Sequence, residues 1–292
     1  YLCGSVYKPS KGRGLLPLVL CPYGHFSNAD TNLYGRYRPD MQYRCATLAR
    51  MGAVAFSYDM FAWGESRLQF PVEMHRTGLA QTMQTLNSIR AIDYLTTLPY
   101  VDGKRIGITG ASGGGSQTFL ATALDDRITV SVPVVMVSSY YYGGCPCESG
   151  MPLQTCGDPL TYNAEIAAMA SPRPMLVVSD GQDWTQNVPG LEFPYLRKVY
   201  ALYGKQENVE NVHLASEGHD YGISKRLAMY EFMAKHLGLD YGRVKDKSGK
   251  VDESKVTVEG YEKLLVFGKN GKMPEDALHT PEEVWKSLKA LQ

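Results

Sequence analysis

Short hydrophobic runs recur along the chain, and each is bounded by Gly, Pro or Asp. They are 16–21 (LPLVLC), 52–60 (GAVAFSYDM), 105–110 (RIGITG), 128–137 (ITVSVPVVMV), 174–180 (PMLVVSD) and 211–217 (NVHLASE). Strands buried on both faces of a parallel sheet have this nearly continuous apolar character. The pattern therefore predicts six core strands, and residues 1–12 (YLCGSVYKPSKG) predict a further strand that ends in a turn.

Stretches with helical periodicity lie between these runs. Residues 78–98 place Leu79, Met83, Leu86, Ile89, Ile92 and Leu95 at spacings of three or four, which is typical of one buried helix face. Residues 39–52 precede the second run, and 224–238 follow the last and end on Gly. This alternation predicts an α/β fold with a mostly parallel central sheet and helices on both faces.

The character of the chain changes near residue 240. Residues 244–255 (VKDKSGKVDESK) are charged and rich in turn formers. In 280–291, Thr280 is a suitable cap and Pro281 suits the first helical position. We therefore expect one main α/β domain over 1–240, which lacks upstream residues, and a C-terminal extension over 241–292 with a terminal helix.

Composition excludes some classes of protein. Of the 292 residues, 44% are hydrophobic and 21% are charged, as in globular domains. Lys plus Arg equals Asp plus Glu, 30 against 30, so no positive field favours nucleic acid. No apolar run approaches the roughly 20 residues of a membrane span. We expect neither a nucleic-acid partner nor a membrane span, and the oligomeric state is open.

Three of the six cysteines crowd together in 143–156, at Cys145, Cys147 and Cys156. Loop packing or a disulfide is favoured over zinc, because no histidine lies nearby in the sequence. We predict no metal and no cofactor.

The stretch 107–120 (GITGASGGGSQTFL) places one serine among glycines, between a predicted strand and a helix-like run. Gly110, Ser112 and Gly114 form a G-x-S-x-G motif, which in this context indicates a nucleophile elbow. The N–H of Gly113 is then one oxyanion donor, at a helix N-terminus. The alternative is an ordinary glycine-rich turn that binds phosphate.

A serine nucleophile needs a base and an orienting acid, in the chain order Ser, Asp or Glu, His. His213 falls in a predicted strand and His236 in a predicted helix. His219 lies in a loop after the last strand, where a base belongs. The acid is expected after the preceding strand, at Asp180 or Asp183, and the loop position favours Asp183.

The second oxyanion donor is expected in the loop after an early strand. There Gly24 gives backbone freedom, and the N–H of His25 or Phe26 can turn inward. His25 is alternatively a substrate contact or a packing residue.

Together these segments resemble the α/β-hydrolase superfamily, in particular its acetyl xylan esterase-like and dienelactone hydrolase-like carbohydrate esterases. The resemblance covers residues 1 to about 240, and its carriers are LCPYGH, YDMFAWGES, GITGASGGGSQTFLATALDDRI, GGCPCE, ASPRPMLVVSDGQDWTQNVP and EGHDYG. It implies Ser112 as nucleophile, Asp183 as acid and His219 as base. Related glucuronoyl esterases take their acid from another loop, which makes Glu148 a rival.

Two departures qualify the resemblance. Dienelactone hydrolases use a cysteine nucleophile, so Ser112 favours cleavage of oxygen esters. The early loop has PYGH where HGG or HGH is usual, which leaves the second oxyanion donor open.

Aromatic side chains in the expected catalytic loops suit a sugar ring, although loop packing is the simpler role for most. Candidate substrate contacts are Tyr23, Trp63, Glu148 and Trp184. The resemblance implies a serine carboxylesterase that acts on esterified carbohydrate or on another small ester. The ester group expected before others is acetyl. Alternatives are a glucuronoyl or methyl esterase, a serine peptidase or amidase, and a non-catalytic binding module. We hypothesise a secreted or periplasmic protein whose leader is not visible.

Overall fold

The computed structural model describes residues 1–292 except 12–13, 26–33, 140–146, 148–160 and 291–292. Its described residues form a seven-stranded sheet in the order β1-β3-β2-β4-β5-β6-β7. The strands are β1 (Gly4–Tyr7), β2 (Leu16–Leu20), β3 (Val54–Tyr58), β4 (Val101–Ala111), β5 (Ile128–Val134), β6 (Met175–Asp180) and β7 (Val209–Leu214). Within this sheet only the edge strand β1 is antiparallel to its neighbour, so all other carboxyl ends meet at one edge.

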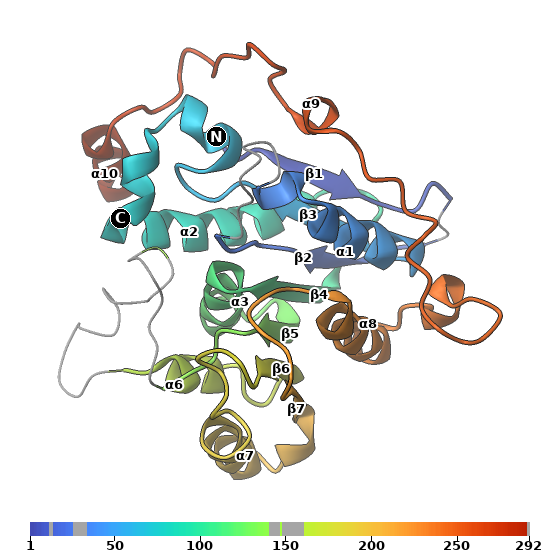
Figure 1. The fold of residues 1–292 in the computed structure, drawn as a ribbon. Coiled ribbons are helices and arrows are strands. Elements are labelled where there is room, and N and C mark those ends of the chain that lie inside the picture. Colours follow the sequence, from blue (N-terminus) through green and yellow to red (C-terminus); the bar gives the residue numbers. More distant parts are fainter. Residues whose placement is uncertain (12–13, 26–33, 140–146, 148–160, 291–292) are drawn as a thin grey trace.

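Helices cover both faces of this sheet (Figure 1). One face carries α1 (Pro39–Arg50) and α8 (Ile223–Leu237). The other carries α2 (Gly78–Leu95), α3 (Gly113–Leu124), α6 (Asn163–Ala168) and α7 (Glu192–Leu202). Shorter elements are η1 (Gly35–Tyr37), η2 (Gly64–Leu68), η3 (Val72–Arg76), η4 (Gln206–Asn208), η5 (Tyr241–Val244), α9 (Tyr261–Leu264) and α10 (Pro281–Lys289).

Strand β2 shows how the continuous apolar runs serve two cores. Leu18 and Leu20 pack in the cluster with α2, whereas Val19 packs with α1 and α8. Successive side chains point to opposite faces of a strand, so a strand covered on both faces must be apolar at every position.

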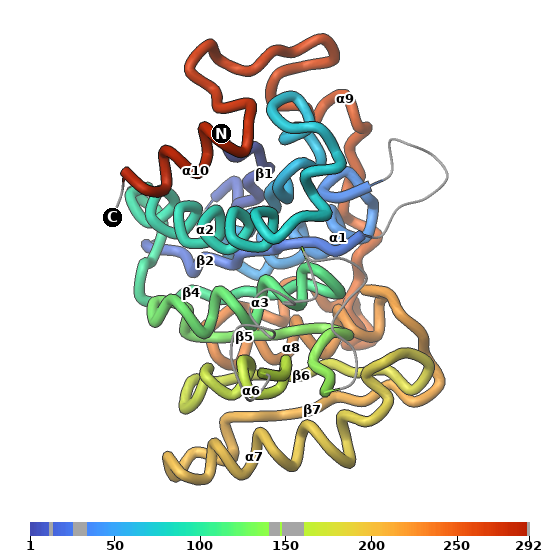
Figure 2. The backbone as a smooth tube through the Cα atoms, turned by 90° about the vertical axis from the view of Figure 1, so that its left-hand side faces the viewer, coloured from blue at the N-terminus to red at the C-terminus, as the bar shows by residue number. Residues whose placement is uncertain are grey.

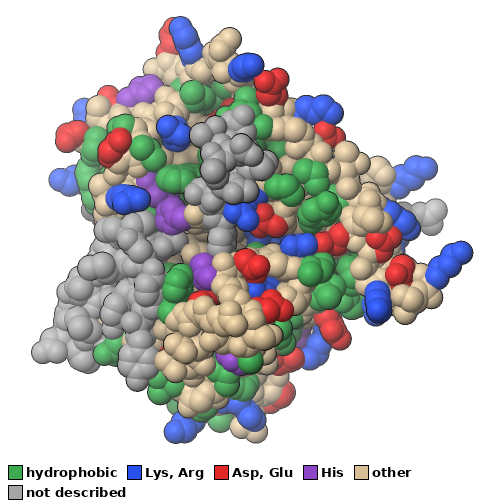
Figure 3. Space-filling model, in the orientation of Figure 1, with side chains coloured by type: hydrophobic (Ala, Val, Ile, Leu, Met, Phe, Trp, Pro, Cys, Tyr) green, Lys and Arg blue, Asp and Glu red, His purple; other side chains and the backbone are tan. Residues whose placement is uncertain are grey.

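The predicted α/β architecture is confirmed, with six core strands in the predicted places. Strand β4 begins four residues earlier than its apolar run, because Val101 and Asp102 pair with Leu16 and Pro17 of β2. On the face in Figure 3, acidic and basic side chains are interspersed, in keeping with their equal numbers. Among the described residues, no helix has the length and apolar character needed to cross a bilayer.

The segment after residue 240 wraps back over the β1 side of the sheet, and α10 lies beside α2 (Figures 1 and 2). Two fully or nearly buried side chains bind its backbone. Arg36 donates to the carbonyl of Leu264, and the Glu65 carboxylate accepts from the N–H groups of Val266 (2.8 Å) and Phe267 (2.9 Å). At α10, Thr280 accepts a hydrogen bond from the Glu283 N–H (3.2 Å), which is the cap that the sequence predicts.

Candidate active site

Ser112 lies between the end of β4 and the start of α3, with φ +57° and ψ −125°. A positive φ is unfavourable for a residue with a side chain, so the surrounding backbone must impose it. The glycines on either side permit that backbone. A Cβ on Gly110 would lie 2.5 Å from the Gly114 carbonyl oxygen, and one on Gly114 would lie 2.6 Å from the Pro22 carbonyl oxygen. The spacing of the G-x-S-x-G motif thus follows from close backbone contact around a strained serine.

The loop after β2 lies directly against this turn. A Cβ on Gly24 would be 2.6 Å from the Ser112 Cβ and 3.0 Å from the Gly113 nitrogen, so only glycine allows the approach. Gly113 is the first residue of α3, where the helix dipole favours negative charge. Gly24, His25 and Gly113 line one pocket together. Phe26, the other expected oxyanion donor, lies outside the described residues.

Asp183 and His219 are brought together from the loops after β6 and β7. The His219 Nδ1 lies 2.9 Å from Asp183 Oδ2, although the residues are 36 positions apart. The other oxygen, Asp183 Oδ1, accepts from the Thr185 N–H (2.6 Å) and hydroxyl (2.5 Å). The Trp184 ring packs on the His219 ring, with centroids 4.1 Å apart. The carboxylate is therefore held on one side and binds the imidazole on the other, which leaves Nε2 of His219 as the nitrogen that faces away from the acid.

The other candidate groups are placed elsewhere. Asp180 is fully buried at the end of β6 and pairs with Lys225 (Oδ2 to Nζ, 3.2 Å), and its burial raises its pKa to about 6. His213 on β7 lies 2.9 Å from the Ser179 hydroxyl. His236 packs on Phe232 within α8. Glu148, the rival acid and tentative substrate contact, lies outside the described residues.

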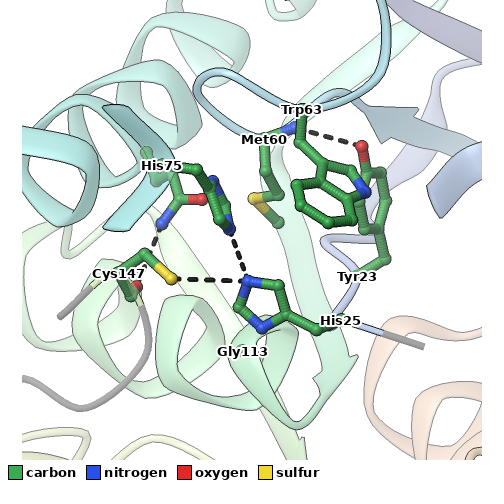
Figure 4. A pocket seen from close by; sticks show the side chains of 9 residues that line it. Tyr23, His25, Met60, Trp63, His75, Gly113 and Cys147 are labelled. Carbon is green, nitrogen blue, oxygen red and sulfur yellow. Dashed lines mark hydrogen bonds between the residues drawn. The ribbon is translucent and has the colours of Figure 1, made fainter. Parts of the chain in front are cut away.

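A small pocket lies beside the serine turn (Figure 4). Its lining residues are Tyr23, Gly24, His25, Met60, Trp63, His75, Gln84, Gly113 and Cys147. Two of the aromatic residues expected to contact substrate are among them. Tyr23 offers its ring to the pocket, because its hydroxyl is bound by other groups. The hydroxyl donates to Asp59 (3.2 Å) and accepts from the Met60 N–H (3.2 Å). Trp63 packs edge-on against His25, with ring centroids 5.6 Å apart, whereas Trp184 lies at His219.

Two histidines meet in this pocket. His75 Nδ1 lies 2.6 Å from the Phe61 carbonyl oxygen, so it is the protonated nitrogen and Nε2 accepts. His25 Nε2, 2.5 Å from His75 Nε2, is then the donor between the two rings (Figure 4). His75 comes from η3, in a segment whose sequence has no recognisable motif, and sequence reasoning missed it together with Met60 and Gln84.

Cys147 completes a cluster of possible metal ligands with His25 and His75, at 3.4 Å from Sγ to His25 Nε2. Cys147 is disulfide-bonded, however, and only a thiolate is an effective ligand. The two imidazoles are accounted for as a hydrogen-bonded pair. Of the two roles that the sequence favoured for the 143–156 cluster, loop packing or a disulfide, Cys147 has the second.

Comparison with known proteins relates the chain to esterases. A family model described as acetyl xylan esterase (AXE1) matches residues 83–142. The solved structure of methylesterase BT1017 is 47% identical, with a TM-score of 0.87, over 99% of this chain and 64% of that one. The 4-O-methyl-glucuronoyl methylesterase of Neurospora crassa is 24% identical over 294 residues, which cover 85% of this chain and 68% of that protein.

Two further matches set limits on this relationship. The acetyl xylan esterase from Paenibacillus sp. R4 (21% identity, TM-score 0.54, 81% of this chain and 80% of that one) shares the fold. The uncharacterized protein PA2218 of Pseudomonas aeruginosa is 28% identical over 138 residues, 46% of this chain. The chain spans 33% of that protein's length and 64% of BT1017. With its sheet, its strained serine turn and these relatives, the chain has the α/β-hydrolase fold and is similar to carbohydrate esterases of that fold.

Proposed function

We propose that this chain is a serine esterase that removes ester groups from carbohydrate, with Ser112 as nucleophile, His219 as base and Asp183 as acid. The observation that carries the proposal is the 2.9 Å hydrogen bond between Asp183 and His219. It joins two loops at the same edge of the sheet as the strained Ser112 turn.

In the proposed reaction, Ser112 Oγ attacks the ester carbonyl and gives its proton to His219 Nε2. Asp183 holds the proton on Nδ1 and stabilises the imidazolium that forms. The Gly113 N–H, with a second N–H from the His25 loop, stabilises the charge on the carbonyl oxygen. The imidazolium then protonates the leaving alcohol, and water hydrolyses the acyl-enzyme by the same steps in reverse.

The ester that the site removes is proposed from the relatives and the pocket. The 47% identity to a methylesterase over 99% of this chain favours a methyl ester of a sugar carboxylate. An acetyl ester is the second candidate, because the acetyl xylan esterase model covers the Ser112 segment. The small size of the pocket beside Gly113 agrees with a small ester group rather than a bulky one.

The test compares a methyl-esterified polyuronate with an acetylated xylan, and measures released methanol and acetate. We expect methanol release to exceed acetate release and both to be lost in Ser112→Ala, because loss of a triad member costs several orders of magnitude in turnover. A peptide anilide is assayed in parallel, as the substrate that tests the alternative function of a serine peptidase or amidase. Ester hydrolysis by Ser112→Ala at more than about a tenth of the wild-type rate would exclude the proposed nucleophile.

A further inference from the structure

Lys225, the third residue of α8, has a fully buried side chain. Its Nζ donates to Glu217 Oε2 (3.1 Å), the Gly218 carbonyl (3.1 Å) and Asp220 Oδ1 (2.5 Å). An ammonium group has three N–H donors, so these acceptors use all of them. The acceptors precede and follow His219 in the chain, and one cation therefore holds the loop of the proposed base from both sides.

The same ammonium group reaches the loop of the proposed acid. Asp180 Oδ2 lies 3.2 Å from Lys225 Nζ, and both side chains are fully buried. The Asp180 N–H donates to the Thr185 hydroxyl (2.9 Å), which itself donates to Asp183 Oδ1 (2.5 Å). Lys225 is thus linked to Asp183 through two residues, and directly to the segment that carries His219.

A buried lysine is costly unless its charge is compensated, and an apolar residue at the same place is often equally stabilising. Burial lowers the pKa of Lys225, but Asp220, Glu217 and Asp180 raise it more, so the side chain is charged at neutral pH. Two further bonds fix the carboxylates: the Ser224 hydroxyl donates to Glu217 (2.6 Å) and the Gly222 N–H to Asp220 (2.8 Å). A charged group at this place therefore has a role that packing alone does not explain.

We propose that Lys225 is a positioning residue, which fixes His219 and Asp183 relative to each other for proton transfer. This inference rests on the proposed function. Among the described residues, the lining of the pocket beside Gly113 does not include Lys225. We therefore expect its loss to slow proton transfer, while substrate binding is retained.

The experiment compares Lys225→Met with Lys235→Met by hydrolysis of p-nitrophenyl acetate. Lys235 lies on the same helix, has a 60% exposed side chain and pairs with Glu210 (2.7 Å), so it is a matched control. We expect Lys225→Met to lower kcat about 10- to 100-fold, because small misplacements of catalytic groups have effects of that size. KM is expected to change less than about twofold, and Lys225→Arg to recover part of kcat, since it keeps the cation.

A second variant keeps the test decisive if Lys225→Met does not fold. Asp220→Asn alters an acceptor whose side chain is 58% exposed, so folding is retained, and it is expected to lower kcat without raising KM. Wild-type kcat in Lys225→Met, or in a folded Asp220→Asn when Lys225→Met is insoluble, would overturn the positioning role. If Ser112→Ala is inactive while either of these results is found, the proposed function is retained and only the positioning role is excluded. If Ser112→Ala is active, both the proposed function and the positioning role are excluded.

Discussion

Replacing Asp183 by asparagine probes the proposed acid with almost no change in shape. Asp183 Oδ1 accepts from the Thr185 N–H at 2.6 Å, and that backbone donor cannot move aside. The substituted side chain must therefore keep its amide oxygen toward Thr185, which turns the amide NH2 toward His219 Nδ1. That nitrogen can then only accept, so the proton of the neutral imidazole moves to Nε2, which must be unprotonated to take the proton of Ser112.

The expected loss follows from this change of tautomer. A triad whose base is held in the wrong tautomer loses about 10⁴ in kcat, or about 5 kcal/mol of transition-state stabilisation. The assay is hydrolysis of p-nitrophenyl acetate under saturating substrate, with thermal melts to show that the variant folds. KM is expected to stay close to the wild-type value, because Asp183 lies behind His219 and away from the pocket lining.

Two controls make the result specific. Asp180→Asn is the same substitution three residues upstream, at a carboxylate bound to Lys225, and is expected to cost far less in turnover. Glu148→Gln is expected to lie between the two and to raise KM in part. The reasoning would be refuted if Asp183→Asn kept more than about a tenth of wild-type turnover, or if Glu148→Gln lost more activity than Asp183→Asn.

Three other outcomes follow from the structure. Thr185→Val removes the hydroxyl that donates to Asp183 but keeps the backbone donor, so kcat should fall about tenfold with KM unchanged; wild-type kcat would contradict this. Burial raises the pKa of Asp180 from 3.8 to about 6, so between these values the folded state binds the proton and the unfolded state does not. Stability to urea, compared with Asp180→Asn, should therefore fall by at most about 3 kcal/mol as pH rises from 4 to 6, and a rise would contradict the assignment. Activity should be unchanged in EDTA, and a loss that a divalent metal restores would overturn the prediction of no metal.

The strands and the elbow were accessible from sequence because their signals are local. The apolar runs predicted the core strands, and Gly110, Ser112 and Gly114 share one strand–turn–helix segment. Helix α7 was not singled out, because its exposed Tyr195 and Leu202 are as apolar as the residues that pack into the core, which are Phe193, Leu196, Val199 and Tyr200. Apolar residues on both faces of a helix obscure its periodicity.

The supporting contacts of the site were not accessible, because they join segments far apart in the chain. His75 meets His25 across 50 positions, and Lys225 of α8 meets Asp180 at the end of β6. His75 and Lys225 belong to no recognisable motif, and a lysine near a helix N-terminus predicts a solvated side chain. The order of strands along the chain predicts which loops share an edge of the sheet, whereas the direction of each side chain depends on packing.

The backbone conformation of Ser112 has a consequence for how this protein responds to selection. A residue with a Cβ at φ +57° raises the energy of the folded state by about 1–3 kcal/mol, and a glycine there does not. Ser112→Gly is therefore expected to melt at a higher temperature than the wild type while lacking the proposed nucleophile. A library screened for heat resistance alone would enrich this change and discard catalysis, so directed evolution of this scaffold needs turnover in every round.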